Sequence, residues 1–325
     1  PAGSSVLTPR WGQHQAGPRG RGGHQPHTGY LLAVDAPQPL AVDGDGGARD
    51  DVAAQVLVVL DAAVGAVVDG DARRVAVKNL RAALGLDERP ALRLAKRCFI
   101  SLGLSGAELL RLGGRTALIK ERIRLVGEEH LKAALAAGRG VVLFTAHLGN
   151  WELCGQALSL AGYRVHPIVQ EQANERVYAF IDRERRAMGL RPISRGFSLR
   201  EVLRALREGG CVSIMPDQEA GGKGVFVPFF GRPALTPRGI VVVAFLSGAP
   251  IVPCFFRRTR PGYHEIRFGA PVPLVRTGEE EEDIRKNLAR INALLEAEIK
   301  EHPEEWLWIY DRWRTRPKDE GRPSF

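Results

Sequence analysis

The sequence predicts an α/β fold: a mainly parallel central sheet flanked by helices, with a helical N-terminal part and a C-terminal helix. Apolar runs with the length and composition of buried strands lie at 140–147, 164–170, 211–217 and 250–258. Helical stretches alternate with these runs at 151–161, 174–189, 198–208 and 237–247. Because parallel strands need crossover connections, this alternation is typical of a parallel sheet covered by helices.

Two helical regions and one further strand complete the pattern. From residue 71 to 112, apolar residues recur at helical spacing opposite a basic face. Residues 263–269 alternate in polarity and predict a strand. Thr277 and Glu280 have capping-box spacing. The predicted C-terminal helix then carries one apolar stripe, formed by Ile284, Leu288, Ile291, Leu295 and Ile299.

Composition divides the chain into four parts. Residues 1–50 are rich in Gly and Pro, and we expect a disordered segment or a wrongly assigned start. Residues 51–114 predict a helical N-terminal region, 115–317 the α/β core with its C-terminal helix, and 318–325 a tail. The stretch 52–68 is the nearest approach to a membrane span, but Gln55 and Asp61 interrupt it, so we interpret it as a soluble or interfacial segment.

Charge and cysteine content narrow the possible partners. The formal net charge is +9, which favours nucleic acid, an anionic membrane or an acidic carrier protein. No nucleic-acid-binding motif accompanies it, so no nucleic-acid partner is expected. The four cysteines form no C-x-x-C pair and have no histidine at zinc-ligand spacing, and we interpret them as buried, reduced thiols. The basic helical residues from Asp71 onward fit either an anionic membrane surface or a solvated helix face.

The most informative stretch is FTAHLGNWELCG, residues 144–155. A strand runs into His147, Gly149 permits a tight turn, and Asn150 is a good N-cap for the next helix. Glu152 then falls in the first turn of that helix. A carboxylate at that distance could fix the tautomer of the His147 ring, leaving the other nitrogen free to act as a general base.

Two other interpretations of this pair stay open on spacing alone. A histidine beside a helix start is often a hydrogen-bonded scaffold residue. The pair could also ligate a metal, but no third ligand lies nearby at a familiar spacing, so neither a metal nor another cofactor is predicted.

A second candidate stretch covers residues 215–239. It follows a predicted strand, contains a glycine-rich loop, and has Thr236 before a helix that begins with proline. Phe229 and Phe230 could contact an acyl chain or a membrane, although at least one of them should belong to the core. The sequence contains neither a G-x-S-x-G nucleophile motif nor a phosphate-binding loop, which argues against an α/β-hydrolase and a P-loop enzyme.

At these stretches the sequence resembles the bacterial lipid A biosynthesis acyltransferase family, within the lysophospholipid acyltransferase-like superfamily, which implies a glycerolipid acyltransferase-like fold. HLGNWE is similar to the family's H-x-x-x-x-[DE] box. Four later blocks follow in the family's order: ISRG at 193–196, PDQ at 216–218, VFVPFFG at 225–231 and WLWIYDRWRTRP at 306–317. The similarity runs from about Asp71 to Pro317. Mycobacterial mannoside acyltransferases carry a similar first box.

The resemblance implies an acyltransferase in which His147 and Glu152 are catalytic, without an acyl-enzyme, metal or other cofactor. The donor would be a thioester of acyl carrier protein, or less often of coenzyme A. The acceptor would be a hydroxyl of a membrane lipid or glycolipid at the cytoplasmic face of the inner membrane, most simply a lipid A precursor. Family members usually begin with a membrane-anchoring helix, which residues 1–50 lack, so the association is expected to be peripheral unless an anchor is missing. Candidate substrate-binding residues are Asn150, Trp151, Arg195, Asp217, Gln218, Phe229, Phe230 and Thr236.

Within that set, Arg195 is the candidate for contacting a phosphate or the developing oxyanion. Three alternatives remain beside the lipid A precursor. The acceptor could be a phosphatidylinositol-mannoside-like or other lysolipid. The same His–Glu pair could activate water in a lipid or thioester hydrolase. The basic charge alone would allow a nucleic-acid-binding module.

Overall fold

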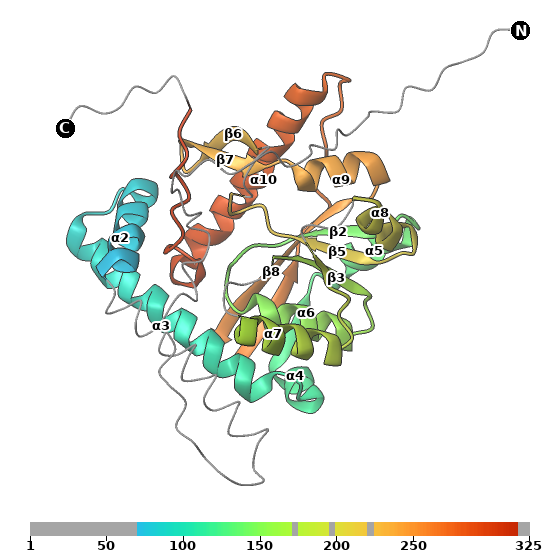
Figure 1. Cartoon of the computed structure of the whole chain (residues 1–325), viewed down its shortest axis with the longest axis horizontal. Helices are drawn as coiled ribbons and strands as arrows, with labels where there is room; N and C mark the ends of the chain where they lie inside the picture. The colour runs from blue at the N-terminus through green and yellow to red at the C-terminus, as the bar shows by residue number, and fades with distance from the viewer. Residues whose placement is uncertain (1–69, 171–174, 195–198, 220–223, 318–325) are drawn as a thin grey trace, which may run out of the picture.

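The computed structural model describes residues 70–170, 175–194, 199–219 and 224–317. The predicted segment 1–50, the interfacial candidate 52–68, the tail and Arg195 lie outside the described residues (Figure 1).

A seven-stranded sheet forms the centre of the described chain, in the order β1-β9-β8-β2-β5-β3-β4. Neighbouring strands are parallel except β8 and β9, which form an antiparallel hairpin. The predicted α/β fold with a mainly parallel sheet is therefore confirmed. The strands are β1 (Ile123–Val126), β2 (Val141–Phe144), β3 (Val165–Val169), β4 (Ile193–Ser194), β5 (Cys211–Ile214), β8 (Ile251–Arg260) and β9 (Tyr263–Phe268).

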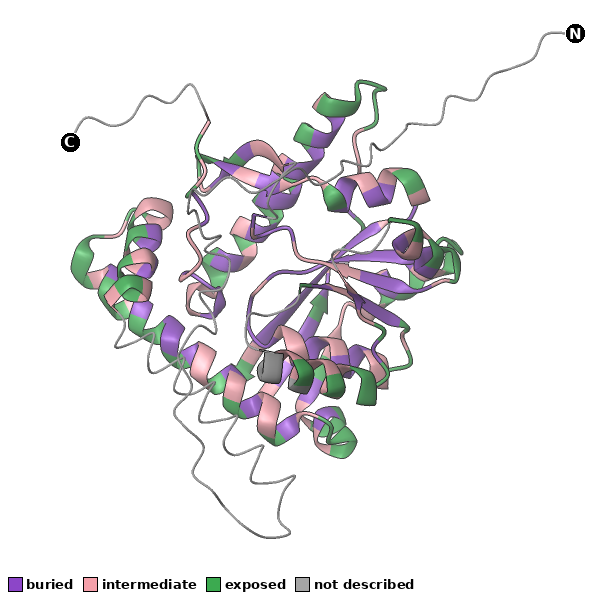
Figure 2. Cartoon of the chain, viewed as in Figure 1, coloured by how far each residue is buried: buried purple, intermediate pink, exposed green. Residues whose placement is uncertain are grey.

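Helices cover both faces of this sheet (Figure 1). They are α2 (Gly70–Leu84), α3 (Glu88–Leu112), α4 (Thr116–Arg122), α5 (Glu128–Ala136), α6 (Trp151–Leu160), α7 (Glu175–Ala187), α8 (Leu199–Arg207), α9 (Gly239–Ser247) and α10 (Glu280–Glu301), followed by a short 3₁₀ turn at Pro303–Glu305. Side chains of α5 and α6 share one apolar core, whereas those of α8, α9 and α10 share the other. Figure 2 shows that the strands are buried while the outer helix faces are exposed.

Strand β2 separates the two cores in the way its sequence requires. Val142 and Phe144 pack into the core under α8, α9 and α10, and Val141 and Leu143 pack into the core under α5 and α6. Successive side chains of a strand point to opposite faces. A strand covered on both faces is therefore apolar at every position, which is why VVLF reads as a continuous run.

The predicted strand at 140–147 is too long, because the ladder of β2 ends at Phe144. Thr145 still donates its N–H to the carbonyl of Ile214 over 3.2 Å, and the chain then leaves the sheet. The apolar run continues through Ala146 because this stretch stays buried beyond the strand. An apolar run in the sequence indicates which residues are buried. It therefore overestimates the length of a strand when the chain stays buried beyond the last hydrogen-bonded pair.

Strands β6 (Gly224–Phe229) and β7 (Arg232–Pro237) form a separate two-stranded hairpin. This corrects the sequence interpretation of Thr236, which was expected to precede a helix that begins with proline. Thr236 and Pro237 instead lie in β7, and α9 begins at Gly239. The side chain of Thr236 is fully buried and accepts a hydrogen bond from Arg312 over 2.7 Å, which favours the strand.

The start of α10 also differs from the predicted capping box. The side chain that receives the free N–H groups is Asp283, which accepts from the backbone of Thr277 at 2.7 Å and of Gly278 at 3.1 Å. Thr277 also donates its hydroxyl to Asp283 over 2.8 Å. Asp283, about one turn further along the helix, thus accepts the backbone N–H groups that Glu280 was predicted to bind. The apolar stripe of the helix is buried as predicted.

Candidate active site

His147 lies three residues beyond the end of β2, at the carboxyl edge of the sheet. The following turn needs Gly149, whose φ is +61° and where a Cβ would lie 2.5 Å from the carbonyl oxygen of Phe256. Asn150 caps α6 by accepting the N–H of Leu153 over 3.3 Å. The predicted order of strand, histidine, tight turn and capped helix is therefore present.

The imidazole of His147 pairs with Asp217. Its Nδ1 lies 2.9 Å from Oδ1 of Asp217, and the backbone N–H of His147 donates to Oδ2 over 3.0 Å. Since a carboxylate only accepts, Nδ1 carries the proton and Nε2 is left as the basic nitrogen. The His147 side chain is 22% exposed and that of Asp217 is 1% exposed. The Asp217 carboxylate is therefore shielded from solvent, whereas the His147 ring remains partly accessible to it.

This pairing corrects the expectation that Glu152 would fix the tautomer of His147. Glu152 instead forms a two-pronged ion pair with Arg185 of α7: Nε donates to Oε2 over 2.9 Å and Nη2 to Oε1 over 2.5 Å. The first turn of α6 directs the carboxylate toward α7. Asp217 reaches the ring because it follows β5, which pairs with β2 in parallel, so both strands end at the same edge.

Three charges set the protonation of the pair. Burial opposes a positive charge on the His147 ring, but the charge and hydrogen bond of Asp217, with the charge of Glu152, outweigh it and raise the pKa of His147. Burial also works against the Asp217 carboxylate, yet the His147 ring and the hydrogen bonds from His147 and Trp306 hold the pKa of Asp217 below its ordinary value. The arrangement favours proton uptake by the ring.

The aromatic tail of the chain forms part of this site, which the sequence did not reveal. The indole N–H of Trp306 donates to Oδ2 of Asp217 over 3.0 Å. Around it, Gly149 donates its N–H to the carbonyl of Glu305 over 2.9 Å, and Leu307 donates its N–H to the carbonyl of His147 over 3.2 Å. The tail therefore holds both the backbone of His147 and the carboxylate of its partner.

The remaining predicted site residues fall into two groups. Near the dyad, the ring of Trp151 packs edge-on against that of His147, with centroids 5.2 Å apart, and Gln218 follows Asp217 in a half-buried position. On the core side of Trp306, Phe229 is fully buried, with ring centroids 5.6 Å apart, and belongs to the core. Phe230 is half-buried, packs against Phe229, and has a positive φ of 50° at the hairpin turn.

Asn150 and Thr236 are structural in their visible contacts. Asn150 is buried, and its amide donates to the carbonyl of Ser105 on α3 over 2.8 Å. Thr236 connects Arg312 and Asn292 inside the core. Contact of either side chain with a substrate stays a prediction.

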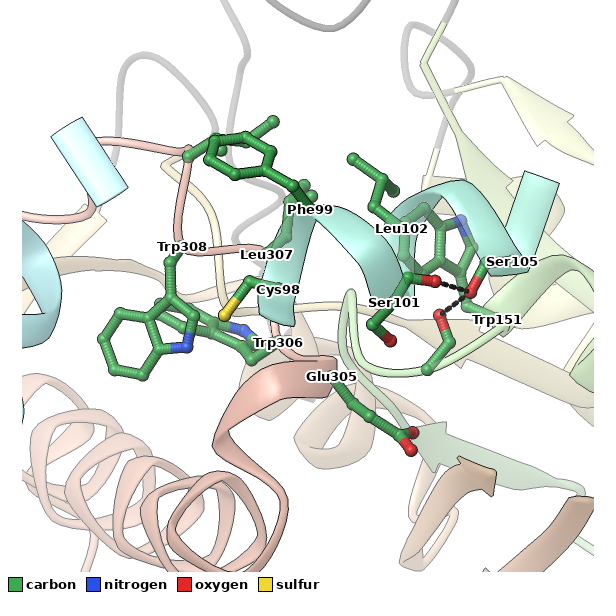
Figure 3. A pocket seen from close by; sticks show the side chains of 12 residues that line it. Cys98, Phe99, Ser101, Leu102, Ser105, Trp151, Glu305, Trp306, Leu307 and Trp308 are labelled. Carbon is green, nitrogen blue, oxygen red and sulfur yellow. Dashed lines mark hydrogen bonds between the residues drawn. The ribbon is translucent and has the colours of Figure 1, made fainter. Parts of the chain in front are cut away.

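A small hollow lies beside the site, between α3, the Gly149 turn and the tail (Figure 3). It holds about 10 Å³, the space of a single water molecule. Among the described residues, no three His, Cys, Asp or Glu side chains gather as a metal site.

Comparison with known proteins identifies the family. The family model described as bacterial lipid A biosynthesis acyltransferase matches residues 54–315. The chain belongs to that family.

Individual relatives differ in the lipid that they modify. The chain is 31% identical over 205 residues to the lipid A biosynthesis palmitoleoyltransferase of Escherichia coli (strain K12), covering 60% of this chain and 62% of the relative. It is 28% identical over 207 residues to the lauroyltransferase of the same organism, covering 62% and 64%. It is 36% identical over 146 residues to the phosphatidylinositol mannoside acyltransferase of Mycobacterium tuberculosis (strain ATCC 25618 / H37Rv), covering 43% and 46%. Each match thus spans less than two thirds of the relative.

Membership of this acyltransferase family agrees with the order of the motif blocks along the chain. HLGNWE supplies His147, PDQ supplies Asp217, and the closing block supplies Trp306. No helix among the described residues has the length and apolar character needed to span a membrane.

Proposed function

We propose that this protein transfers a fatty acyl chain from a thioester to a hydroxyl of a membrane lipid or glycolipid. The observation that carries the proposal is the pair of His147 and Asp217 at the carboxyl edge of the sheet, in a chain of an acyltransferase family. Such a pair provides a general base whose positive form is stabilised.

The proposed reaction needs no acyl-enzyme. Nε2 of His147 takes the proton of the acceptor hydroxyl while the acceptor oxygen attacks the thioester carbonyl. Asp217 stabilises the imidazolium that forms. When the tetrahedral intermediate collapses, the carbon–sulfur bond breaks and the imidazolium returns the proton to the leaving thiolate. The products are an ester and a free thiol.

Glu152 has an indirect role in this proposal. Its carboxylate is held by Arg185, yet its charge contributes to the raised pKa of His147. The negative charge of Glu152 therefore supports the protonated form of His147 from the side of α6. Arg195 is the proposed donor to the oxyanion or to a phosphate of the substrate.

The proposed donor is a thioester of acyl carrier protein, with coenzyme A as the alternative, and the proposed acceptor is a lipid A precursor. The net charge of +9 suits an acidic carrier and an anionic lipid. The relative from Mycobacterium tuberculosis, whose name specifies phosphatidylinositol mannoside, favours a mannoside acceptor as the second candidate.

We further propose peripheral binding to the cytoplasmic face of the inner membrane through α3. Its outer face places Arg93 and Lys96 beside exposed Ile100 and Leu104, with Ile100 53% exposed. Within the described residues, neither Arg93 nor Lys96 has an ion-pair partner. A basic and apolar helix face of this kind suits an anionic lipid surface.

The test is a transfer assay with purified protein, acyl carrier protein and coenzyme A thioesters, and a panel of lipid A precursors and mannosides. We expect ester formation that depends on acceptor, and a loss of roughly 10²- to 10⁴-fold in His147→Ala, the range of general-base catalysis. His130→Ala, on α5, is the control. Thiol release without any acceptor would indicate a hydrolase, and a folded His147→Ala with normal turnover would reject the assignment.

A further inference from the structure

A buried arginine at the end of β8 binds helix α3 to the sheet. The guanidinium of Arg258 donates from Nε to Oε1 of Glu108 over 2.8 Å and from Nη2 to Oε2 over 3.0 Å. Both side chains are only 9% exposed. A forked, buried pair of this kind fixes two elements in one geometry, because both nitrogens must face both oxygens.

The same guanidinium also binds two serines of α3. Nη1 donates to the hydroxyl of Ser101 over 2.9 Å, and Nη2 donates to the hydroxyl of Ser105 over 2.9 Å. Ser101, Ser105 and Glu108 stand one turn apart on one face of the helix. Arg258 therefore uses all three of its nitrogens to hold this face.

This face of α3 is also bound to the turn after His147. The amide of Asn150 donates to the carbonyl of Ser105 over 2.8 Å and lies 3.5 Å from Oε2 of Glu108. The hydroxyl of Ser105 lies 3.4 Å from the carbonyl oxygen of Gly149. The groups that bind Arg258 thus hold the two residues that shape the turn.

The tail closes the cluster from the other side. The backbone N–H of Arg258 lies 3.2 Å from both carboxylate oxygens of Glu305, whose carbonyl accepts the N–H of Gly149. Burial raises the pKa of Glu305 to about 7.

His264 also faces Glu108, with its Nε2 3.4 Å from Oε1 of Glu108. Burial lowers the pKa of His264 to about 4, so this ring is neutral at pH 7. Figure 3 shows Ser101, Ser105 and Glu305 around the small hollow at this junction.

We propose that Arg258 is a positioning residue for acyl transfer: through Glu108 and Ser105 it holds the turn at Gly149 and Asn150. When the turn is held in this position, it keeps the His147 ring against Asp217. The inference rests on the proposed function, in which His147 is the base. It also gives α3, the helix with the proposed membrane face, a direct mechanical connection to the active site.

The decisive variant is Arg258→Lys, which keeps the charge but has a single nitrogen. One ammonium cannot span the carboxylate of Glu108 and both serine hydroxyls. The turn should loosen, and a misplacement of about 1 Å costs a reaction roughly 10²-fold. We expect kcat to fall roughly 10- to 100-fold while KM stays within about 2-fold.

A second expected effect separates positioning from general stability. Asp217 and, from α6, Glu152 are the carboxylates that raise the pKa of His147. If the ring drifts from Asp217, that pKa falls, and the acidic limb of the pH–rate profile moves to lower pH. A merely structural loss of folded protein would scale the profile without moving it.

The neighbouring residue offers a matched control. Arg257 is 10% exposed and binds two carboxylates of α10, with Nε 2.5 Å from Oε1 of Glu298 and Nη2 2.6 Å from Oε2 of Glu301. None of its bonds reaches the turn. Arg257→Lys should therefore lower stability and leave the His147 titration unchanged.

The experiment is an NMR titration of the His147 ring in the full chain, assigned with His147→Ala, alongside kcat, KM and pH profiles. A lower pKa of His147 in Arg258→Lys but not in Arg257→Lys supports the inference, and equal shifts or none in the two overturn it. If wild-type protein shows no transfer, the proposed function fails, whereas the titration of His147 still decides whether Arg258 is a positioning residue.

If Arg258→Lys does not fold, Ser105→Ala replaces it. We expect the pKa of His147 to fall in that variant as well, and an unchanged pKa would overturn the inference.

Discussion

Trp306 and His147 share one carboxylate. The indole N–H of Trp306 donates to Oδ2 of Asp217 over 3.0 Å, and Nδ1 of His147 lies 2.9 Å from Oδ1 of the same group. Because Asp217 is only 1% exposed, these bonds replace water as its partners. The aromatic segment that begins at Trp306 therefore orients the carboxylate that pairs with the His147 ring.

We expect Trp306→Phe to lower kcat/KM by roughly 10- to 100-fold, because one hydrogen bond to a buried charge is worth about 1.5–3 kcal/mol. The phenyl ring keeps most of the apolar contact. Trp308→Phe is the control, since the indole of Trp308 donates to the carbonyl of Pro303 instead, over 2.7 Å. Steady-state kinetics on both folded variants tests this, and equal losses in the two would assign Trp306 to packing alone.

Asp217→Asn should lower the maximal rate by roughly 10²-fold or more and move the acidic limb of the pH–rate profile to lower pH. In the proposed mechanism His147 acts when neutral, and the charge and hydrogen bond of Asp217 raise its pKa, so the acidic limb of the wild-type pH–rate profile should lie above the ordinary pKa of histidine. Without that charge, the pKa falls. Glu219→Gln, in the same loop but paired with Arg314 at 2.9 Å, is the control. A limb that stays in place in Asp217→Asn would contradict the pairing.

Glu152→Gln should lower kcat about 10-fold and leave KM within about 2-fold, because the charge of Glu152 supports the imidazolium without touching the ring. The acidic limb of the pH–rate profile should move to lower pH, as in Asp217→Asn. The shift should be smaller, because Asp217 raises the pKa of His147 more than Glu152 does. Glu184→Gln on α7 is the control. A rise in KM alone would make Glu152 a substrate-binding residue.

Reversal of two charges on α3, Arg93→Glu with Lys96→Glu, should abolish salt-sensitive binding to vesicles that contain anionic lipid. Near such a surface each basic residue is worth up to about 1 kcal/mol, and salt screens it over about 8–10 Å. Arg285→Glu with Lys286→Glu on α10 makes the same change of charge elsewhere. Cosedimentation at several salt concentrations measures both. Wild-type binding that resists a salt wash, or no binding, would reject the peripheral interpretation.

The sequence by itself determined five of the seven strands of the central sheet, all but β1 and β4, and the local shape of the turn after His147. Continuous apolar runs such as residues 141–144 mark strands covered on both faces. The neighbourhood of His147 was also predictable, because Gly149 and Asn150 act on adjacent backbone: one supplies a positive φ and the other caps a helix. These are interactions over a few residues, whose partners the spacing alone specifies.

Only the tertiary structure decided which residue completes the dyad. Glu152 is five positions from His147 and was the natural partner by spacing, but the turn of α6 directs it to Arg185. Asp217 is 70 positions away and becomes the partner because β5 pairs with β2. Trp306 and Arg258 enter in the same way, from the tail and from β8. Spacing along the chain does not encode the order of strands in a sheet, and that order, set by the packing of both cores, chooses which distant side chains meet at one edge.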